Sequence, residues 1–218
     1  MARKLGLIRV INRFRPTISY EQRVHEALVN TVKPGDVVWD VGANVGIYTE
    51  QFCEWVGPSG YVVAFEPFAG SCEQIRSRVP DCAWVQIENI ALGDADAVGV
   101  LTVGDESVQN HISTGTNLVK GNTSTVPVTI ASGNSWSERN GHSPNVIKID
   151  VEGFEAEVLD GMSEVLTKPT LRSVLVEVHF SKLELRGKAL APNQMEGLLR
   201  NKGFKTSWVD SSHLLAVR

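Results

Sequence analysis

A short segment of the chain combines a carboxylate with two glycines directly after an apolar run. Residues 40–46 read Asp-Val-Gly-Ala-Asn-Val-Gly. Glycine lets the backbone approach a ligand, and the N-terminus of a following helix offers unpaired N–H groups to a negatively charged moiety. Dinucleotide sites have the pattern G-x-G-x-x-G, and Asp40 ahead of the first glycine would repel a pyrophosphate. Asp40 can instead bind, or orient through water, the α-ammonium group of a methionine moiety, which favours S-adenosylmethionine.

Asn44 occupies a position where many nucleotide-binding loops have glycine. Asn tolerates a left-handed backbone better than other non-glycine residues, and its amide can bind a ligand carboxylate or the loop itself. Glu66 follows about twenty residues after the loop, where an acid can accept hydrogen bonds from ribose hydroxyls. The alternative is that Gly42 and Gly46 only form a turn while Asp40 caps the next helix.

Strand and helix patterns alternate around this loop, which predicts βαβ units and a parallel sheet. A Ser-x-x-Gln capping box at Ser19 begins a helix before the first strand, and two strands separated by a turn close the chain as an antiparallel hairpin. The fold class is therefore α/β, with a doubly wound, mostly parallel sheet. The predicted strands are 36–41, 61–65, 83–87, 145–150, 171–178, 204–209 and 213–217, and the predicted helices after the first strand are 47–56, 68–78, 152–166 and 192–201.

The middle of the chain breaks this alternation. Two strands rich in β-branched residues, 98–103 and 125–130, flank a polar stretch at 104–122 that we expect to be a mobile loop, and a second polar loop covers 131–144. We interpret 104–144 as an inserted loop segment within a single domain, 1–218, that begins with a helical extension over 1–33.

Ligands of an open parallel sheet bind at the carboxyl ends of its strands. Polar side chains follow five of the predicted strands at these ends, so we expect them to lie at one edge of the sheet. In the order of the chain they are Asp40, Glu66, Asn89, Asp150, and Glu177 with His179.

His179 and Asp150 are the candidate general bases at this edge. A histidine has a suitable pKa near neutral pH, and Glu177 can orient it or act in its place. In the plainer alternative, His179 hydrogen-bonds a neighbouring loop and Glu177 forms an ion pair. His111, in a polar loop, and Glu152 are possible acceptor contacts. A divalent-metal site built from Asp150, Glu152, Glu177 and His179 is a further alternative, which we do not favour because their spacing is not diagnostic.

Composition and charge disfavour some classes of protein. The formal net charge of −4 gives no general reason to bind a nucleic-acid backbone. No apolar stretch approaches the roughly 20 residues that cross a bilayer, and the basic segment 1–15 lacks the features of a secretory signal, so we expect a cytoplasmic protein. Cys53, Cys72 and Cys82 form no C-x-x-C pair, and their odd number leaves at least one thiol unpaired. We expect buried structural thiols and a reducing compartment. No pattern indicates an oligomeric state.

Four motifs occur in a fixed order along the chain. They read DVGANVGIYT at 40–49, AFEP at 64–67, NIALGD at 89–94 and IKIDVEGFEAEVLDGM at 147–162. Together they resemble the FkbM family of S-adenosylmethionine-dependent methyltransferases, and the resemblance covers about residues 36–179. It implies a seven-stranded doubly wound sheet whose final hairpin makes one strand antiparallel. It also implies O-methylation of a hydroxyl group, typically on a sugar or a natural product.

The same resemblance implies roles for individual residues. Glu66 would hold the ribose, Asn89 would lie near adenine, and Asp150 would lie near the transferred methyl group. The methyl acceptor is expected to be a small molecule with a hydroxyl group. Other readings are a metal-dependent O-methyltransferase, an NAD-binding oxidoreductase and a module that binds S-adenosylmethionine without catalysis. The methionine end of the cofactor would be lined by Asp40, Gly42, Asn44, Gly46 and Tyr48.

Overall fold

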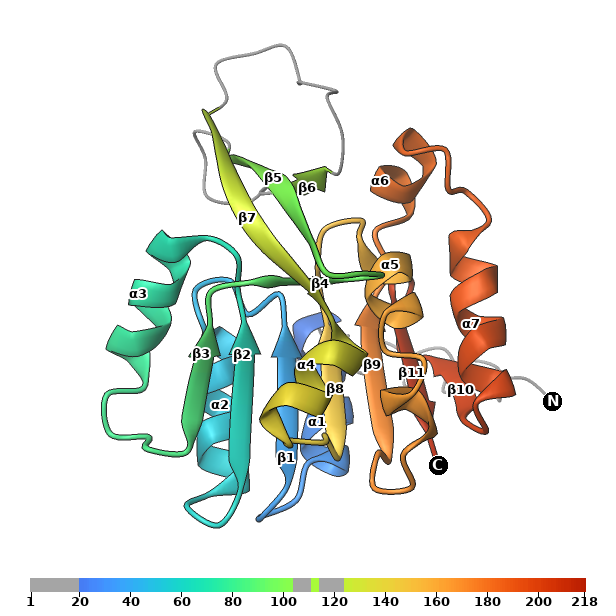
Figure 1. The fold of residues 1–218 in the computed structure, drawn as a ribbon. Helices are drawn as coiled ribbons and strands as arrows, with labels where there is room; N and C mark the ends of the chain where they lie inside the picture. The colour runs from blue at the N-terminus through green and yellow to red at the C-terminus, as the bar shows by residue number, and fades with distance from the viewer. Residues whose placement is uncertain (1–19, 104–110, 114–123) are drawn as a thin grey trace, which may run out of the picture.

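The computed structural model describes residues 20–103, 111–113 and 124–218, which form two sheets with helices around them (Figure 1). The larger sheet has seven strands, of which only β11 (His213–Val217) runs antiparallel to its neighbours in the described part of the chain. This confirms the predicted sheet and its C-terminal hairpin. In spatial order the strands are β10 (Lys205–Trp208), β11, β9 (Ser173–Glu177), β8 (Val146–Ile149), β1 (Val37–Val41), β2 (Tyr61–Phe65) and β3 (Val85–Glu88).

Helices cover both faces of this sheet, so its strands are apolar on both sides. Val38 and Val62 pack in one layer with two of the helices, whereas Trp39 and Val63 pack in the opposite layer. The first layer contains α1 (Tyr20–Thr31) and α2 (Ile47–Val56), and α3 (Ala69–Arg78) packs beside α2. The second contains α4 (Gly133–Asn140), α5 (Glu155–Asp160) and α7 (Ala191–Asn201). Among the described helices, none is long and apolar enough to cross a bilayer.

A second, four-stranded sheet extends from the end of the large sheet at which β1, β2 and β3 terminate (Figure 1). Its two long strands pair antiparallel, and they include the strands predicted at 98–103 and 125–130. The expected mobile loop at 104–122 lies outside the described residues, apart from the short strand β6. The order of strands is β4 (Ala91–Gly93), β7 (Ser124–Ser132), β5 (Ala97–Val103) and β6 (His111–Ser113).

The predicted loop at 131–144 is wrong, because this stretch contains helix α4. The Ser132 side chain caps the helix by accepting a hydrogen bond from the Ser135 N–H at 3.1 Å. Trp136 is buried and makes edge-to-face contacts with Trp39 and Phe65, whose ring centroids lie 5.2 and 4.9 Å away. The sequence analysis missed α4 because its composition is polar. The helix is stabilised by the Ser132 cap and by the buried side chain of Trp136.

The helix predicted at 152–166 is also shorter than expected. It begins at Glu155, ends at Asp160, and is followed by a short 3₁₀ turn, Val165–Thr167. Phe154, Val158 and Met162 are nevertheless buried against the sheet, as their spacing predicted. A further short helix, α6 (Phe180–Leu185), follows β9 and was not predicted.

The cysteines are not all thiols. Cys53 of α2 forms a disulfide with Cys82, which precedes β3, whereas Cys72 is a buried thiol. At least one thiol was expected to be unpaired, and Cys72 is that thiol; the expectation of buried thiols is wrong for Cys53 and Cys82, so cysteine usage no longer supports a reducing compartment. The two bonded cysteines are 29 residues apart in the sequence, and no local pattern indicated that they pair.

Candidate active site

The loop after β1 turns sharply before α2 begins. Gly42, Asn44 and Gly46 have φ angles of 79°, 50° and 85°, so Asn44 adopts the left-handed conformation that its residue type allows. A Cβ atom at position 42 would collide with the carbonyl oxygen of Asp150. Gly42 thus permits the β1 loop to pack directly against the end of β8, and this contact places Asp150 beside the loop.

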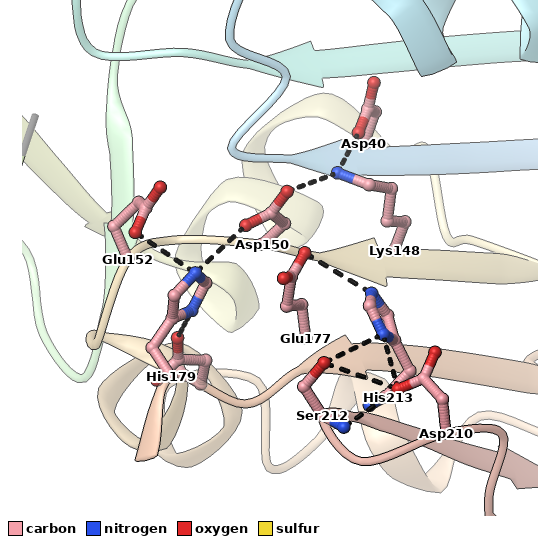
Figure 2. Close-up of polar contacts among 10 residues, drawn as sticks. Asp40, Lys148, Asp150, Glu152, Glu177, His179, Asp210, Ser212 and His213 are labelled. Carbon is pink, nitrogen blue, oxygen red and sulfur yellow. Dashed lines mark hydrogen bonds and ion pairs between the residues drawn. The ribbon is translucent and has the colours of Figure 1, made fainter. Parts of the chain in front are cut away.

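Asp40 is fully buried and faces a cation that the sequence analysis missed. Its Oδ2 accepts a hydrogen bond from the Thr49 hydroxyl at 2.6 Å, and the Nζ of Lys148 lies 3.4 Å from its Oδ1. The same ammonium lies 3.5 Å from Oδ2 of Asp150, so Lys148 links the ends of β1 and β8 (Figure 2). Burial lowers the pKa of Lys148, but the charges of Asp40 and Asp150 outweigh this effect and raise the pKa above its usual value. A basic residue in the otherwise apolar run Val146–Ile149 was the available signal.

Glu66 fixes the relative positions of the loop and the end of β2. The backbone N–H groups of Asn44 and Phe68 donate to its two carboxylate oxygens at 2.8 and 2.9 Å. The Asn89 amide donates to the carbonyl oxygens of Glu66 and Pro67 at 3.0 and 2.9 Å. Burial raises the pKa of Glu66. Glu66 and Asn89 therefore both lie at the predicted edge, where they hold the turn that follows β2.

The side chains of Asp150, Glu152 and His179 meet at the ends of β8 and β9 (Figure 2). Nε2 of His179 lies 3.1 Å from Oε2 of Glu152 and 3.7 Å from Oδ1 of Asp150. Its Nδ1 lies 2.6 Å from Oε1 of Glu155, a fully buried residue that the sequence analysis did not select. The structure thus brings together three residues from the predicted set and adds a fourth.

The electrostatics of this group differ from the expected ones. Burial lowers the pKa of His179, but hydrogen bonds with Glu152 and Glu155 outweigh it and raise the pKa to about 10. The neighbouring carboxylates thus stabilise the protonated imidazole, which is opposite to the direction expected for a general base at neutral pH; the catalytic role of His179 stays a prediction. Burial also raises the pKa of Asp150.

Glu177 contacts a different histidine from the one expected. Its Oε2 lies 3.3 Å from Nε2 of His213, whose Nδ1 lies 3.0 Å from Oδ1 of Asp210 (Figure 2). The carboxylate that hydrogen-bonds Nδ1 of His179 is Glu155 instead. Glu177 and His213 also line a small cavity of about 30 Å³, whose other polar lining residues are Tyr48 and Lys148.

The two remaining predicted residues, Tyr48 and His111, lie in different parts of the fold. The ring of Tyr48 has the Nζ of Lys148 5.1 Å from its centroid, and burial raises the pKa of its hydroxyl. Tyr48 therefore lies beside Lys148, the residue that contacts both Asp40 and Asp150, while its role in binding the cofactor stays a prediction. His111 lies on β6 of the second sheet, paired with Thr102, and the surroundings of its side chain are outside the described residues.

The sequence that builds this site was compared with known protein families. The family model described as the methyltransferase FkbM domain matches residues 40–206. The chain belongs to the FkbM methyltransferase family. This confirms the resemblance carried by the four motifs. Hexuronic acid methyltransferase AglP from Haloferax volcanii is 30% identical to this FkbM-family chain over 159 residues, which are 73% of the chain and 62% of AglP. The chain thus spans about three-fifths of the length of this curated relative.

Solved structures share the fold of this FkbM-family chain at low sequence identity. A putative rRNA methylase from Clostridium thermocellum has a TM-score of 0.56 at 12% identity, covering 89% of this chain and 91% of that one. Precorrin-6y C5,15-methyltransferase from Geobacter metallireducens has a TM-score of 0.53 at 12% identity, with 93% and 91% covered. Fibrillarin from Aeropyrum pernix, with bound S-adenosyl-L-methionine, has a TM-score of 0.50 at 13% identity, with 89% and 73% covered. These likenesses confirm the Rossmann-like fold class.

Proposed function

We propose that this chain is an S-adenosylmethionine-dependent methyltransferase that methylates a hydroxyl group of a sugar-like small molecule. The observation that supports the proposal most strongly is the contact between the β1 loop and Asp150, because the loop is our candidate for binding the methyl donor and Asp150 is our candidate for binding the acceptor. Membership of the FkbM family supports the reaction class.

The donor would bind along the ends of β1, β2 and β3. Glu66, held by two backbone N–H groups, is the candidate partner for the ribose hydroxyls. The exposed Asn89 is the candidate for the adenine side. Asp40 acts on the methionine end through Lys148 and Thr49 in this proposal, since its own carboxylate is fully buried and already bonded.

The acceptor would lie over Asp150, Glu152 and His179. Its oxygen attacks the methyl carbon of the sulfonium, the carbon–sulfur bond breaks with its electron pair going to sulfur, and S-adenosylhomocysteine and a methyl ether result. The hydroxyl proton goes to the Asp150 carboxylate, whose Oδ1 lies 3.7 Å from Nε2 of His179. Because the two groups titrate as a unit, His179 sets the proton affinity of this carboxylate. Most of the rate would come from aligning the oxygen with the methyl group and excluding water.

A carbohydrate acceptor is supported by the relative AglP, whose name specifies a hexuronic acid. Two cations near His179 are a second argument for an acidic sugar. Lys182, whose Nζ contacts Oε2 of Glu152, and Arg186, which contacts Glu157, are cations on and just after α6, near His179. A uronic acid carboxylate would find these groups within the same part of the molecule.

The first experiment measures cofactor choice by calorimetry. We expect S-adenosylhomocysteine to bind and NAD to show no heat of binding. Glu66→Gln should weaken the binding of S-adenosylhomocysteine about tenfold, because it removes one charge-assisted ribose contact of about 1.4 kcal/mol. Binding of NAD without S-adenosylhomocysteine would favour the oxidoreductase reading and overturn the proposal.

The second experiment measures transfer of a labelled methyl group to a panel of hexuronic acid glycosides, neutral glycosides and polyketide alcohols. We expect the first two classes to be labelled. Asp150→Asn and His179→Gln should each lower kcat by about 10²–10⁴, the range for general acid–base catalysis, with S-adenosylhomocysteine still bound. Glu184→Gln, at an exposed position of α6, is the matched control and should leave kcat unchanged. Bound cofactor with no labelled acceptor in any class would instead favour the non-catalytic module.

A further inference from the structure

Three potential metal ligands converge from the ends of two adjacent strands. Asp150 and Glu152 follow β8, His179 follows β9, and one ligand atom from each lies within 4.8 Å of the other two. Atoms bound to one ion at about 2.1 Å are at most about 4.2 Å apart. The two separations that involve Nε2 of His179, 3.1 and 3.7 Å, already meet this limit. A shift of a few tenths of an ångström in one carboxylate side chain would satisfy the third.

The histidine is held in the orientation that a metal ligand needs. Metal-bound histidines commonly donate their other ring N–H to a carboxylate, which fixes the tautomer and the plane of the ring. Glu155 provides this contact at 2.6 Å from Nδ1, and it is fully buried. Its Oε1 also accepts a hydrogen bond from the Gly153 N–H at 2.8 Å, so the carboxylate itself is fixed. Nε2 therefore points at the two oxygen ligands from Asp150 and Glu152.

The buried carboxylate of Glu155 is an independent sign that positive charge belongs here. Its second oxygen, Oε2, is buried and has no hydrogen-bond partner in the described part of the chain. A buried carboxylate is costly unless positive charge compensates it. An imidazole must be neutral to bind a metal, and with His179 neutral the carboxylates of Asp150, Glu152 and Glu155 face two lysines, Lys148 beside Asp150 and Lys182 beside Glu152.

We propose that Asp150, Glu152 and His179 bind one divalent cation of the Mn²⁺ class. Two carboxylate oxygens and one imidazole nitrogen suit a first-row ion of intermediate hardness better than Ca²⁺, which takes oxygen ligands. Three protein ligands leave other positions of the ion open. Since the proposed acceptor carries neighbouring hydroxyl oxygens, two of these can occupy the open positions. This last step rests on the proposed function, whereas the binding of the ion does not.

The test is Mn²⁺ binding to the full chain, freed of metals with a chelator and followed by electron paramagnetic resonance of the free ion. We expect one Mn²⁺ per chain. Asp150→Asn and His179→Ala should each raise the dissociation constant at least tenfold, as loss of a ligand does. Lys182→Met should lower it severalfold, because Lys182 competes for Oε2 of Glu152. The control Glu184→Gln removes a charge from the same helix, α6, and should change the constant less than twofold.

Circular dichroism checks that each variant is folded, and S-adenosylhomocysteine binding is measured separately. The proposal is overturned if no Mn²⁺ binds below about 1 mM, the weak end of protein sites. It is also overturned if the Asp150 and His179 variants bind as tightly as the control, which would indicate diffuse attraction by surface charge. Mn²⁺ binding without S-adenosylhomocysteine binding would leave the cation site standing while the proposed function failed. The reverse result would remove only the cation site.

Discussion

The Nζ of Lys148 lies 3.4 Å from Oδ1 of Asp40, and both side chains are almost completely buried. Asp150 shares the same ammonium at 3.5 Å, so two carboxylates at the ends of adjacent strands depend on one cation. Removing one member of a buried ion pair leaves an uncompensated charge. A change at Lys148 should therefore alter both the stability of this sheet edge and the positions of Asp40 and Asp150 in the site.

Lys148→Met should therefore lower the free energy of unfolding by about 3–5 kcal/mol. Urea denaturation followed by tryptophan fluorescence measures this change. Lys205→Met, at an exposed position of β10, is the control and should stay within about 0.5 kcal/mol of the parent protein. An equally small effect for Lys148→Met would mean that the ammonium does not balance both carboxylates.

The regular elements were predictable because they are determined by local patterns. The expected helix at 47–56 and strand at 61–65 have the observed bounds, since Pro and Gly turns delimit runs with clear periodicity. The site was only partly predictable. The strand ends identified Asp40, Asp150 and His179, but the partners of their side chains, Lys148 and Glu155, depend on contacts between elements that no local pattern specifies.

Helix α4 and the disulfide were likewise not predictable from local sequence patterns. Helix α4 begins Gly-Asn-Ser, residues of low helix propensity, and it forms because Ser132 caps it and Trp136 enters the core. Likewise, the disulfide between Cys53 and Cys82 depends on α2 packing beside the segment before β3. Counting cysteines could establish only that at least one of them stays unpaired.

Gly42→Ala should destabilise the protein by at least about 3 kcal/mol, because a Cβ would collide with the backbone of Asp150 and strain a positive φ angle. Thermal unfolding by calorimetry is the measurement. Gly197→Ala, in α7 where an added Cβ meets no atom within 4 Å, is the matched control and should stabilise the chain by about 0.5–1 kcal/mol. Similar melting temperatures for the two variants would contradict the packing of the loop on β8.

Thiol counting tests the disulfide. The denatured, unreduced chain should react with one equivalent of a thiol reagent, from Cys72, and with three after reduction. In the native state Cys72 should react slowly, since it is buried and burial raises the pKa of its thiol. Cys82→Ser should cost about 3–4 kcal/mol of stability under oxidising conditions. Three reactive thiols without reduction would show that the bond does not form.

His213 should make the stability depend on pH. Burial lowers its pKa, but hydrogen bonds with Glu177 and Asp210 outweigh burial and raise the pKa above 6.5. The folded protein therefore binds this proton more tightly than the unfolded chain, so the contribution is complete below about pH 6.5 and is lost as pH rises through the folded pKa. Urea denaturation at several pH values above 6.5 should show a decline that is smaller in His213→Gln. An unchanged slope in that variant would assign the decline to other groups.

The separation of the two sheets has a consequence for how this chain can vary. The paired strands β5 and β7 hold their register from Ala97 and Ile130 at one end to Val103 and Ser124 at the other, and no residue of the large sheet takes part in that ladder. Residues added or lost beyond Val103 and Ser124 change the length of the connection without shifting any strand of the large sheet. The connection between β5 and β7 can therefore differ in length while the strands of the large sheet, which position the site, keep their register.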